Sequence, residues 1–385
     1  MSPTQRLDLI KILVGIYCFF TAMGMNLVVF PVILKTNNIT ETLIGLSVVI
    51  ELLAGICFAS KIVQLLKTHG AKAFLKVATA IYFAVMMLIG SYINFIIWLG
   101  FILLIGVYWY GFSMIKQSWY NMIIPNKGRN LMISINTIIL SFGFATGSYI
   151  VSVMGSLNPY NMMVAFLFAF ISVISISLIK TPMPEVQDNI SHDVTKFFKR
   201  RPFLYFAKFT QEIISISILS FIVIYAINIG FTSEQGAILA GLFTISAILN
   251  LVSASFLDRF HYKFIFLFVA ICLVGALSGL YYYRDDFMIL SILCFISGFL
   301  VSFYYIGCEA EVNYYFNNEE RLGANNALSF VTNLGGICGC LLTGCLIYRV
   351  GAMGFVLPSI IGQVVIILIL VFCKIGLMSA RKVRA

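Results

Sequence analysis

Two glutamates stand inside long apolar stretches of the sequence, where a charged side chain is unfavourable by roughly 2.5–3.5 kcal/mol in a membrane. Glu51 lies about 12 Å along a helix counted from Leu43, and no basic residue stands three or four positions away. Glu212 lies about 13 Å beyond Phe203. Because removal from water disfavours the charged form of a carboxyl group, both glutamates are candidate proton carriers.

Each glutamate also has a purely structural interpretation. A hydroxyl or amide group on a neighbouring helix could hold the Glu51 carboxyl group. Lys208 stands four residues before Glu212 on the same helix face, where the two can form an ion pair while Lys208 reaches toward water. Lys208, Gln211 and Glu212 together form a candidate polar site near the start of their apolar stretch.

Further polar and aromatic residues lie within apolar stretches. Asn26 could point into a binding site or hydrogen-bond a neighbouring helix. Four aromatic residues lie deeper than an interfacial belt and could stack on an organic substrate, although packing between helices is the commoner role. They are Tyr108, Trp109, Tyr304 and Tyr305.

Charged residues also mark the ends of two apolar stretches, 95–115 and 287–308. Lys116 follows the first, and Glu309 and Glu311 follow the second. We hypothesise that Lys116 pairs with Glu309 or Glu311 when this side of the molecule closes, and that the pair breaks when it opens. The alternative is that these charges reach water independently.

The sequence gives no sign of a metal or cofactor. The three histidines, His69, His192 and His261, fall in short polar stretches, and the nine cysteines lack metal-site spacing. A Gly-x-x-x-x-Gly-Lys-Ser/Thr loop is missing, which excludes direct use of a nucleotide through this motif. We expect neither a bound metal nor a cofactor.

The composition indicates that the candidate residues in the apolar stretches lie within a membrane. Of 385 residues, 61% are hydrophobic and 10% are charged, against about 25% charged in a typical soluble protein. A water-soluble enzyme is therefore excluded. Twelve apolar runs are long enough to cross a bilayer as helices, and their continuous apolar character disfavours a β-barrel. The runs are 10–34, 43–66, 73–93, 95–115, 131–154, 160–180, 203–228, 235–257, 264–283, 287–308, 323–347 and 353–374.

The basic residues indicate orientation. If the N-terminus is cytoplasmic, only Lys35, Arg284 and Arg349 of the 25 lysines and arginines lie outside. We therefore predict a multi-pass protein of the cell (inner) membrane with both termini in the cytoplasm. The net charge of +10 then reflects topology, and a nucleic-acid partner is not expected.

The two halves of the chain match at a nearly constant offset of 191 or 192 residues. The matching pairs are Gly45 with Gly236, Lys72 with Lys263, Arg129 with Arg321, Gly143 with Gly335, and Gly147 with Gly339. The prediction is an all-α membrane protein with twelve transmembrane helices in two pseudo-symmetric six-helix bundles, residues 1–180 and 202–385. A cytoplasmic central loop, 181–201, joins them. In such repeats a substrate site lies between the halves near the middle of the membrane.

This architecture resembles the major facilitator superfamily over the whole chain. The loop motif of that family, Gly-x-x-x-Asp-Arg-x-Gly-Arg, is partly kept by Asp258-Arg259 and ends at Lys263. In the first half Lys67 stands where the acid would be, Ile102 replaces the arginine of the fourth span, and Gly143 to Gly147 lacks the proline of the fifth. Among bacterial members the chain looks most similar to the YcaD-like group.

The resemblance implies a function. It implies the major facilitator fold, a cavity lined by the first, fourth, seventh and tenth spans, and a cytoplasmic gate that includes Asp258 and Arg259. We expect a secondary transporter, not an enzyme, which moves a small organic solute by alternating access and is coupled to protons. We expect it to act as a monomer in the bilayer. The alternatives are an uncoupled facilitator, a membrane-embedded enzyme such as a lipid-modifying transferase, and a solute sensor.

Overall fold

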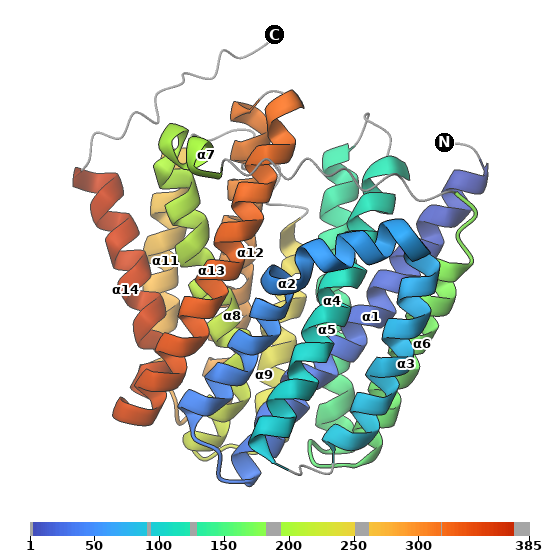
Figure 1. Ribbon diagram of the computed structural model, residues 1–385. Helices are drawn as coiled ribbons and strands as arrows, with labels where there is room; N and C mark the ends of the chain where they lie inside the picture. The colour runs from blue at the N-terminus through green and yellow to red at the C-terminus, as the bar shows by residue number, and fades with distance from the viewer. Residues whose placement is uncertain are drawn as a thin grey trace.

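The computed structural model describes residues 3–90, 94–123, 129–181, 194–250, 262–316 and 318–372, and the regular structure in these ranges is helical (Figure 1). The first half contains α1 Pro3–Thr36, α2 Glu41–His69, α3 Ala71–Ile89, α4 Phe95–Ile123, α5 Arg129–Met154 and α6 Tyr160–Ser177. The short helix α7 is Val194–Arg200. The second half contains α8 Pro202–Asn228, α9 Ser233–Ile245, the 3₁₀ helix η1 Ser246–Leu249, α11 Tyr262–Tyr282, α12 Phe287–Tyr315, α13 Asn318–Val350 and α14 Met353–Phe372.

The expected all-α membrane architecture is confirmed. Within the described ranges, eleven helices are long and apolar enough to cross a membrane. The remaining predicted run, 235–257, covers most of α9 and all of η1, and its last residues lie outside the described part of the chain. A capping box between Thr232 and Gln235 starts α9, and the Asp286 side chain accepts the first free amides of α12.

The two halves stand side by side and meet along two seams (Figure 1). Helix α2 packs against α13 at one seam, and α5 packs against α9 at the other. Helix α1 also contacts α8. We call the end that carries α7 and the start of α1 the α7 end, and the opposite end, with the turns at 37–40, 155–159 and 229–232, the far end.

The internal repeat is visible in how glycines pack. A Cβ atom on Gly143 of α5 would lie 2.7 Å from the carbonyl oxygen of Tyr17 on α1. The matching Gly335 of α13 meets the carbonyl oxygen of Phe209 on α8 at 2.6 Å. Both members of the second contact lie 192 positions after those of the first.

The next turn repeats this pattern: Gly147 lies against the Thr21 carbonyl and Gly339 against that of Ile213, again with one offset of 192. Only glycine leaves room for such backbone contacts.

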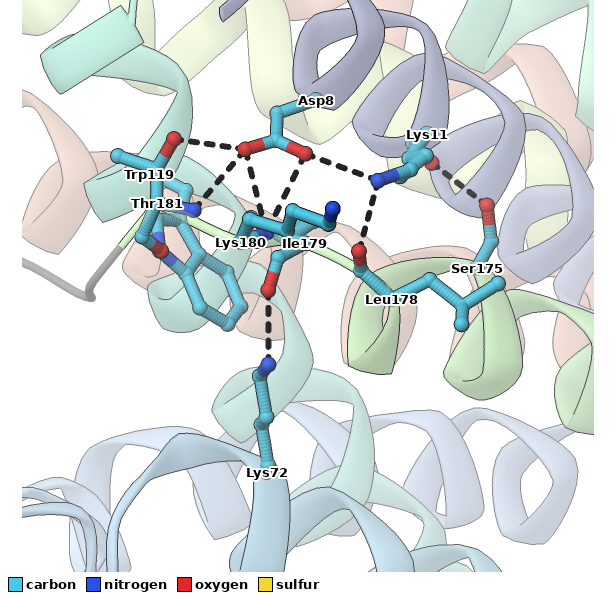
Figure 2. A network of polar contacts seen from close by, with 9 residues as sticks. All are labelled: Asp8, Lys11, Lys72, Trp119, Ser175, Leu178, Ile179, Lys180 and Thr181. Carbon is cyan, nitrogen blue, oxygen red and sulfur yellow. Dashed lines mark hydrogen bonds and ion pairs between the residues drawn. The ribbon is translucent and has the colours of Figure 1, made fainter. Parts of the chain in front are cut away.

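A buried carboxylate binds the end of α6 at the α7 end (Figure 2). Asp8 is fully buried and accepts hydrogen bonds from the backbone nitrogens of Lys180 and Thr181 and from the Thr181 hydroxyl, at 2.7–3.3 Å. Lys11 donates to Asp8 at 3.0 Å and to the Leu178 carbonyl at 2.7 Å. We call this arrangement the Asp8 clip.

Two other helices complete the Asp8 clip (Figure 2). Lys72, at the start of α3, donates to the Ile179 carbonyl at 2.7 Å. The Trp119 indole of α4 donates to the Thr181 carbonyl at 3.2 Å. The segment 178–181 is therefore bound by α1, α3 and α4, and the carbonyls of Leu178, Ile179 and Thr181, which follow the last turn of α6, have partners.

Helix α7 lies within the stretch predicted as a loop, and it packs on the second half. Phe197 meets the Phe316 ring edge to face at 5.5 Å. Arg200 pairs with Glu320 of α13, and the Arg201 guanidinium lies 3.5 Å from the centroid of the Tyr315 ring. The predicted boundary between the two bundles is thus crossed by a chain that is attached to the first half at Thr181 and to the second half at α7.

Candidate functional site

Helix α8 holds a buried ion pair. Lys208 is 1% exposed, and its ammonium group donates to the Glu212 carboxylate at 2.7 Å and to the Gln211 side-chain oxygen at 2.9 Å. Glu212 and Gln211 are buried too. The spacing of four residues predicted this pair, but Lys208 does not reach water. Removing one partner of such a buried ion pair is strongly destabilising, because the other charge is then left buried and unpaired.

Helix α12 adds two residues to this group. The Lys208 ammonium lies 3.8 Å from the centroid of the Tyr305 ring, a cation–π contact. Tyr305 and Glu309 are joined by a side-chain hydrogen bond, and the charges of Lys208 and Glu212 act on Glu309. We call Lys208, Gln211, Glu212, Tyr305 and Glu309 the charged cluster.

The first half contains a buried network built on two tyrosines. The Asn26 amide donates to the Tyr82 hydroxyl at 2.9 Å, and the Thr79 hydroxyl donates to Tyr108 at 3.3 Å. The Tyr82 and Tyr108 rings lie 5.0 Å apart. Asn26 therefore joins α1 to α3. The sequence alone did not single out Tyr82 or Thr79, because apolar spans give no signal for which tyrosine faces a polar partner.

Glu51 lies on α2 beside the tyrosine network and the seam with α13. It is half-buried, and its charge acts on Tyr82 of α3 and on Cys340 of α13. The hydrogen bonds and ion pairs found among the described residues include none from the Glu51 carboxyl group. In the part of the chain that is described, this carboxyl group can change charge without breaking an ion pair.

The four candidate aromatic residues have different surroundings. Tyr108 is buried against Phe19, with 5.4 Å between ring centroids, and Tyr304 is buried against Phe266 at 4.9 Å. Trp109 is half-buried. Of the four, Tyr305 belongs to the charged cluster and Tyr108 to the tyrosine network, whereas Tyr304 packs within the second half.

The residues of the hypothesised gate are partly described. Lys116 is buried on α4, with its ammonium group 5.1 Å from the centroid of the Phe20 ring. Among the described residues it forms no ion pair. Glu309 belongs to the charged cluster, and Glu311 is buried near the end of α12. Asp258 and Arg259 lie outside the described residues.

Polar contacts between the two halves close the far end. The Asn228 amide at the end of α8 donates to the Glu41 carboxylate at 3.4 Å, and Glu41 also pairs with Lys35. The Thr42 hydroxyl donates to the Gly344 carbonyl of α13 at 3.5 Å. Glu41 thereby joins the start of α2 to the second half.

A second carboxylate, that of Glu234, joins the two halves at the seam between α5 and α9. Glu234, in the first turn of α9, accepts hydrogen bonds from the Ser156 backbone nitrogen at 3.2 Å and from its hydroxyl at 3.4 Å. The Ser156 hydroxyl lies 2.6 Å from that of Ser233. Glu41 and Glu234 lie in the first turns of equivalent helices of the two halves. We call these two groups of contacts the far-end seal.

We expect the double substitution Glu41→Ala and Glu234→Ala to open the far end. Each hydrogen bond contributes about 0.5–1.5 kcal/mol, so their loss should shift the balance between closed and open forms by about tenfold. Spin labels at the exposed positions Asn37 and Tyr348 would report the opening as a new population of longer distances between the two labels. Ser152→Ala is the control, because that hydroxyl bonds only within α5. If the double variant and Ser152→Ala give identical distance distributions, the contacts of the far-end seal do not stabilise the closed form.

In the described part of the chain, no three histidine, cysteine, aspartate or glutamate side chains come together in a way that could hold a metal ion. The site therefore consists of the charged cluster in the second half and of Glu51 with the tyrosine network in the first, with the far-end seal beyond both.

Comparison with solved structures shows transporters with the same fold. The nucleoside transporter NupG superposes with a TM-score of 0.76 at 15% sequence identity, over 94% of this chain and 97% of that one. A bacterial homolog of the human lysosomal transporter Spinster, in an inward-facing and unoccupied conformation, gives a TM-score of 0.70 at 14% identity, over 96% of both chains. No curated protein matches the chain significantly in sequence.

The family model of the Major Facilitator Superfamily matches residues 12–283 and, separately, residues 213–381. Together these matches span nearly the whole described chain and include both halves of the repeat. The resemblance noted from the sequence is thus confirmed at the level of the superfamily, and transport, not enzymatic catalysis, is the activity it indicates. The chain belongs to the Major Facilitator Superfamily.

Proposed function

We propose that this protein is a secondary transporter that moves a small organic solute by alternating access and is driven by a proton gradient. The observation that carries the proposal is the charged cluster, which lies inside α8 and α12, two helices long enough to span the membrane. Charged residues in such helices are costly and rare, and by default they mark binding or coupling sites. The solute then binds between the halves, as in other repeats of this kind.

The contacts between the halves support alternating access. The hydrogen bonds described above that join the two halves belong to the far-end seal. With the orientation indicated by Lys35, Arg284 and Arg349, the α7 end is cytoplasmic, so this arrangement opens toward the cytoplasm. We infer a bacterial inner membrane and a monomer, with bundles 1–180 and 202–385 rocking against each other along the α2–α13 and α5–α9 seams.

Glu51 is the better suited of the two proton carriers. Glu212 is engaged by Lys208, so protonation would break a buried ion pair. Glu51 has no such partner among the described residues and lies beside the seam between α2 and α13. A change of its charge can therefore alter contacts between the two halves directly.

The Glu51→Gln variant is expected to lose the uptake that depends on an imposed pH gradient, while exchange of labelled for unlabelled solute across the membrane continues. Uptake into proteoliposomes, screened first with a panel that includes nucleosides, is the measurement. Glu320→Gln, which alters a carboxyl group outside the membrane-spanning part, is the control. If Glu51→Gln still accumulates solute against a gradient, Glu51 does not carry the proton.

The same assay separates the alternatives. An uncoupled facilitator would equilibrate a solute without responding to the pH gradient. A sensor would bind a solute in a thermal-shift assay without moving it. The superfamily match disfavours a membrane-embedded enzyme.

A further inference from the structure

The Lys208 ammonium group is fully engaged within the protein. A lysine has three donor hydrogens and no acceptor. Two hydrogens have oxygen partners, on Gln211 and Glu212, and the ring of Tyr305 covers the ammonium group at 3.8 Å. With 1% of the residue exposed, Lys208 is shielded from any ligand. An anionic solute would have to break these contacts to reach it.

The accessible side of the charged cluster has a different chemistry. Tyr305 and Glu309 are half-buried, whereas Lys208, Gln211 and Glu212 are buried. Glu309 has a hydrogen bond to Tyr305 but no salt bridge among the described residues. A ligand that approaches the charged cluster therefore meets a carboxyl group and an aromatic ring.

The balance between carboxyl groups and lysines in the spanning helices also favours a positively charged ligand. The described membrane-spanning segments carry four buried or half-buried carboxyl groups away from the far end and outside the Asp8 clip, namely Glu51, Glu212, Glu309 and Glu311. Their basic counterparts are Lys208, which is engaged, and Lys116, which lies over Phe20 in the other half. A carboxylate that is partly removed from water is stabilised by a cation, and an aromatic ring beside it binds cations as well.

We propose that the transported solute is an organic cation, a protonated amine, whose ammonium group binds Glu309 and lies against the accessible side of Tyr305. This inference rests on the proposed function, since it names the substrate class of the same site. Glu309 supplies the counter-charge and the hydrogen-bond acceptor, and Lys208 keeps Tyr305 and Glu212 in place.

Three probes that share a phenyl ring and differ in charge test the proposal. They are 2-phenylethylamine, 2-phenylethanol and 3-phenylpropionate, each added to the purified full-length protein while its unfolding temperature is followed. The amine should stabilise the protein, and the alcohol and the acid should not. In Glu309→Gln the apparent affinity for the amine should fall by about ten- to hundredfold, as expected for loss of a charged hydrogen bond. Glu320→Gln should bind the amine like the parent protein.

Two results would overturn the proposal. One is equal or stronger stabilisation by the acid or the alcohol, and the other is unchanged amine affinity in Glu309→Gln. Uptake assays separate this failure from failure of the proposed function. If proteoliposomes accumulate a neutral or anionic solute, transport stands and the cation assignment falls. If the amine binds but no solute in the panel is moved, the assignment of the site stands and the transport proposal falls.

Discussion

Replacing Lys208 with methionine is expected to destabilise the protein more than any other single substitution considered. The change leaves the Glu212 carboxylate buried without its partner, because Lys208 is the cation that neutralises it at 2.7 Å. Loss of one member of a buried ion pair lowers the free energy of unfolding by about 3–5 kcal/mol. The unfolding temperature of the purified protein in detergent, followed by the exposure of its buried cysteines to a fluorescent maleimide, is the measurement.

The double variant Lys208→Met and Glu212→Gln provides the control. With both charges removed, no buried charge is left unpaired, and most of the lost stability should return. Transport should stay impaired in the double variant, because the charged cluster no longer holds Tyr305 in place. If the single and double variants unfold at the same temperature, the ion pair does not contribute as the structure indicates.

Reversing the charge of Lys116 is expected to abolish most transport, and a matching charge reversal on α12 should restore closure of the α7 end. Lys116 is buried without an ion-pair partner among the described residues, while the far end is closed. We propose that the α7 end closes by bringing Lys116 to Glu309 or Glu311. Lys116→Glu then places two carboxylates together and prevents closure, since like charges repel at short range.

Exchanging the charges at both positions tests this pair. Because Glu309 is also proposed to bind the solute, the readout is closure of the α7 end, measured as the distance between spin labels on the two halves. It is compared for Lys116→Glu alone and combined with Glu309→Lys or with Glu311→Lys. Recovery of closure in only one double variant identifies the partner of Lys116. If neither combination recovers any of the closure lost in the single variant, the two helix ends act independently and the gate must be sought elsewhere.

The sequence predicted those features that depend on local spacing or on the bilayer. Apolar length alone locates the spans, since a helix must cross the hydrocarbon with its backbone satisfied. The pair of Lys208 and Glu212 follows from a separation of four residues in one helix. The repeat offset also has a physical basis, because glycines such as Gly143 and Gly335 are required wherever equivalent helices touch.

Contacts between helices could not be predicted in this way. Whether Tyr305 or Tyr304 faces Lys208 depends on the rotation of α12, which packing against its neighbours sets. The pairing of Asn26 with Tyr82 joins positions 56 residues apart. The far-end seal was missed for the same reason, because Glu41 and Glu234 resemble ordinary acidic residues at the starts of helices and their partners lie in the other half.

The Asp8 clip has a consequence for the proposed rocking of the two bundles. Thr181 is the last described residue before the connection to α7, and it is fastened to α1 and α4, while its neighbour Ile179 is fastened to α3. In the proposed rocking motion, tension on this connection would be shared among α1, α3 and α4 instead of unwinding the last turn of α6. The hydrogen bonds around Asp8 would then let the second bundle pull on several helices of the first bundle together.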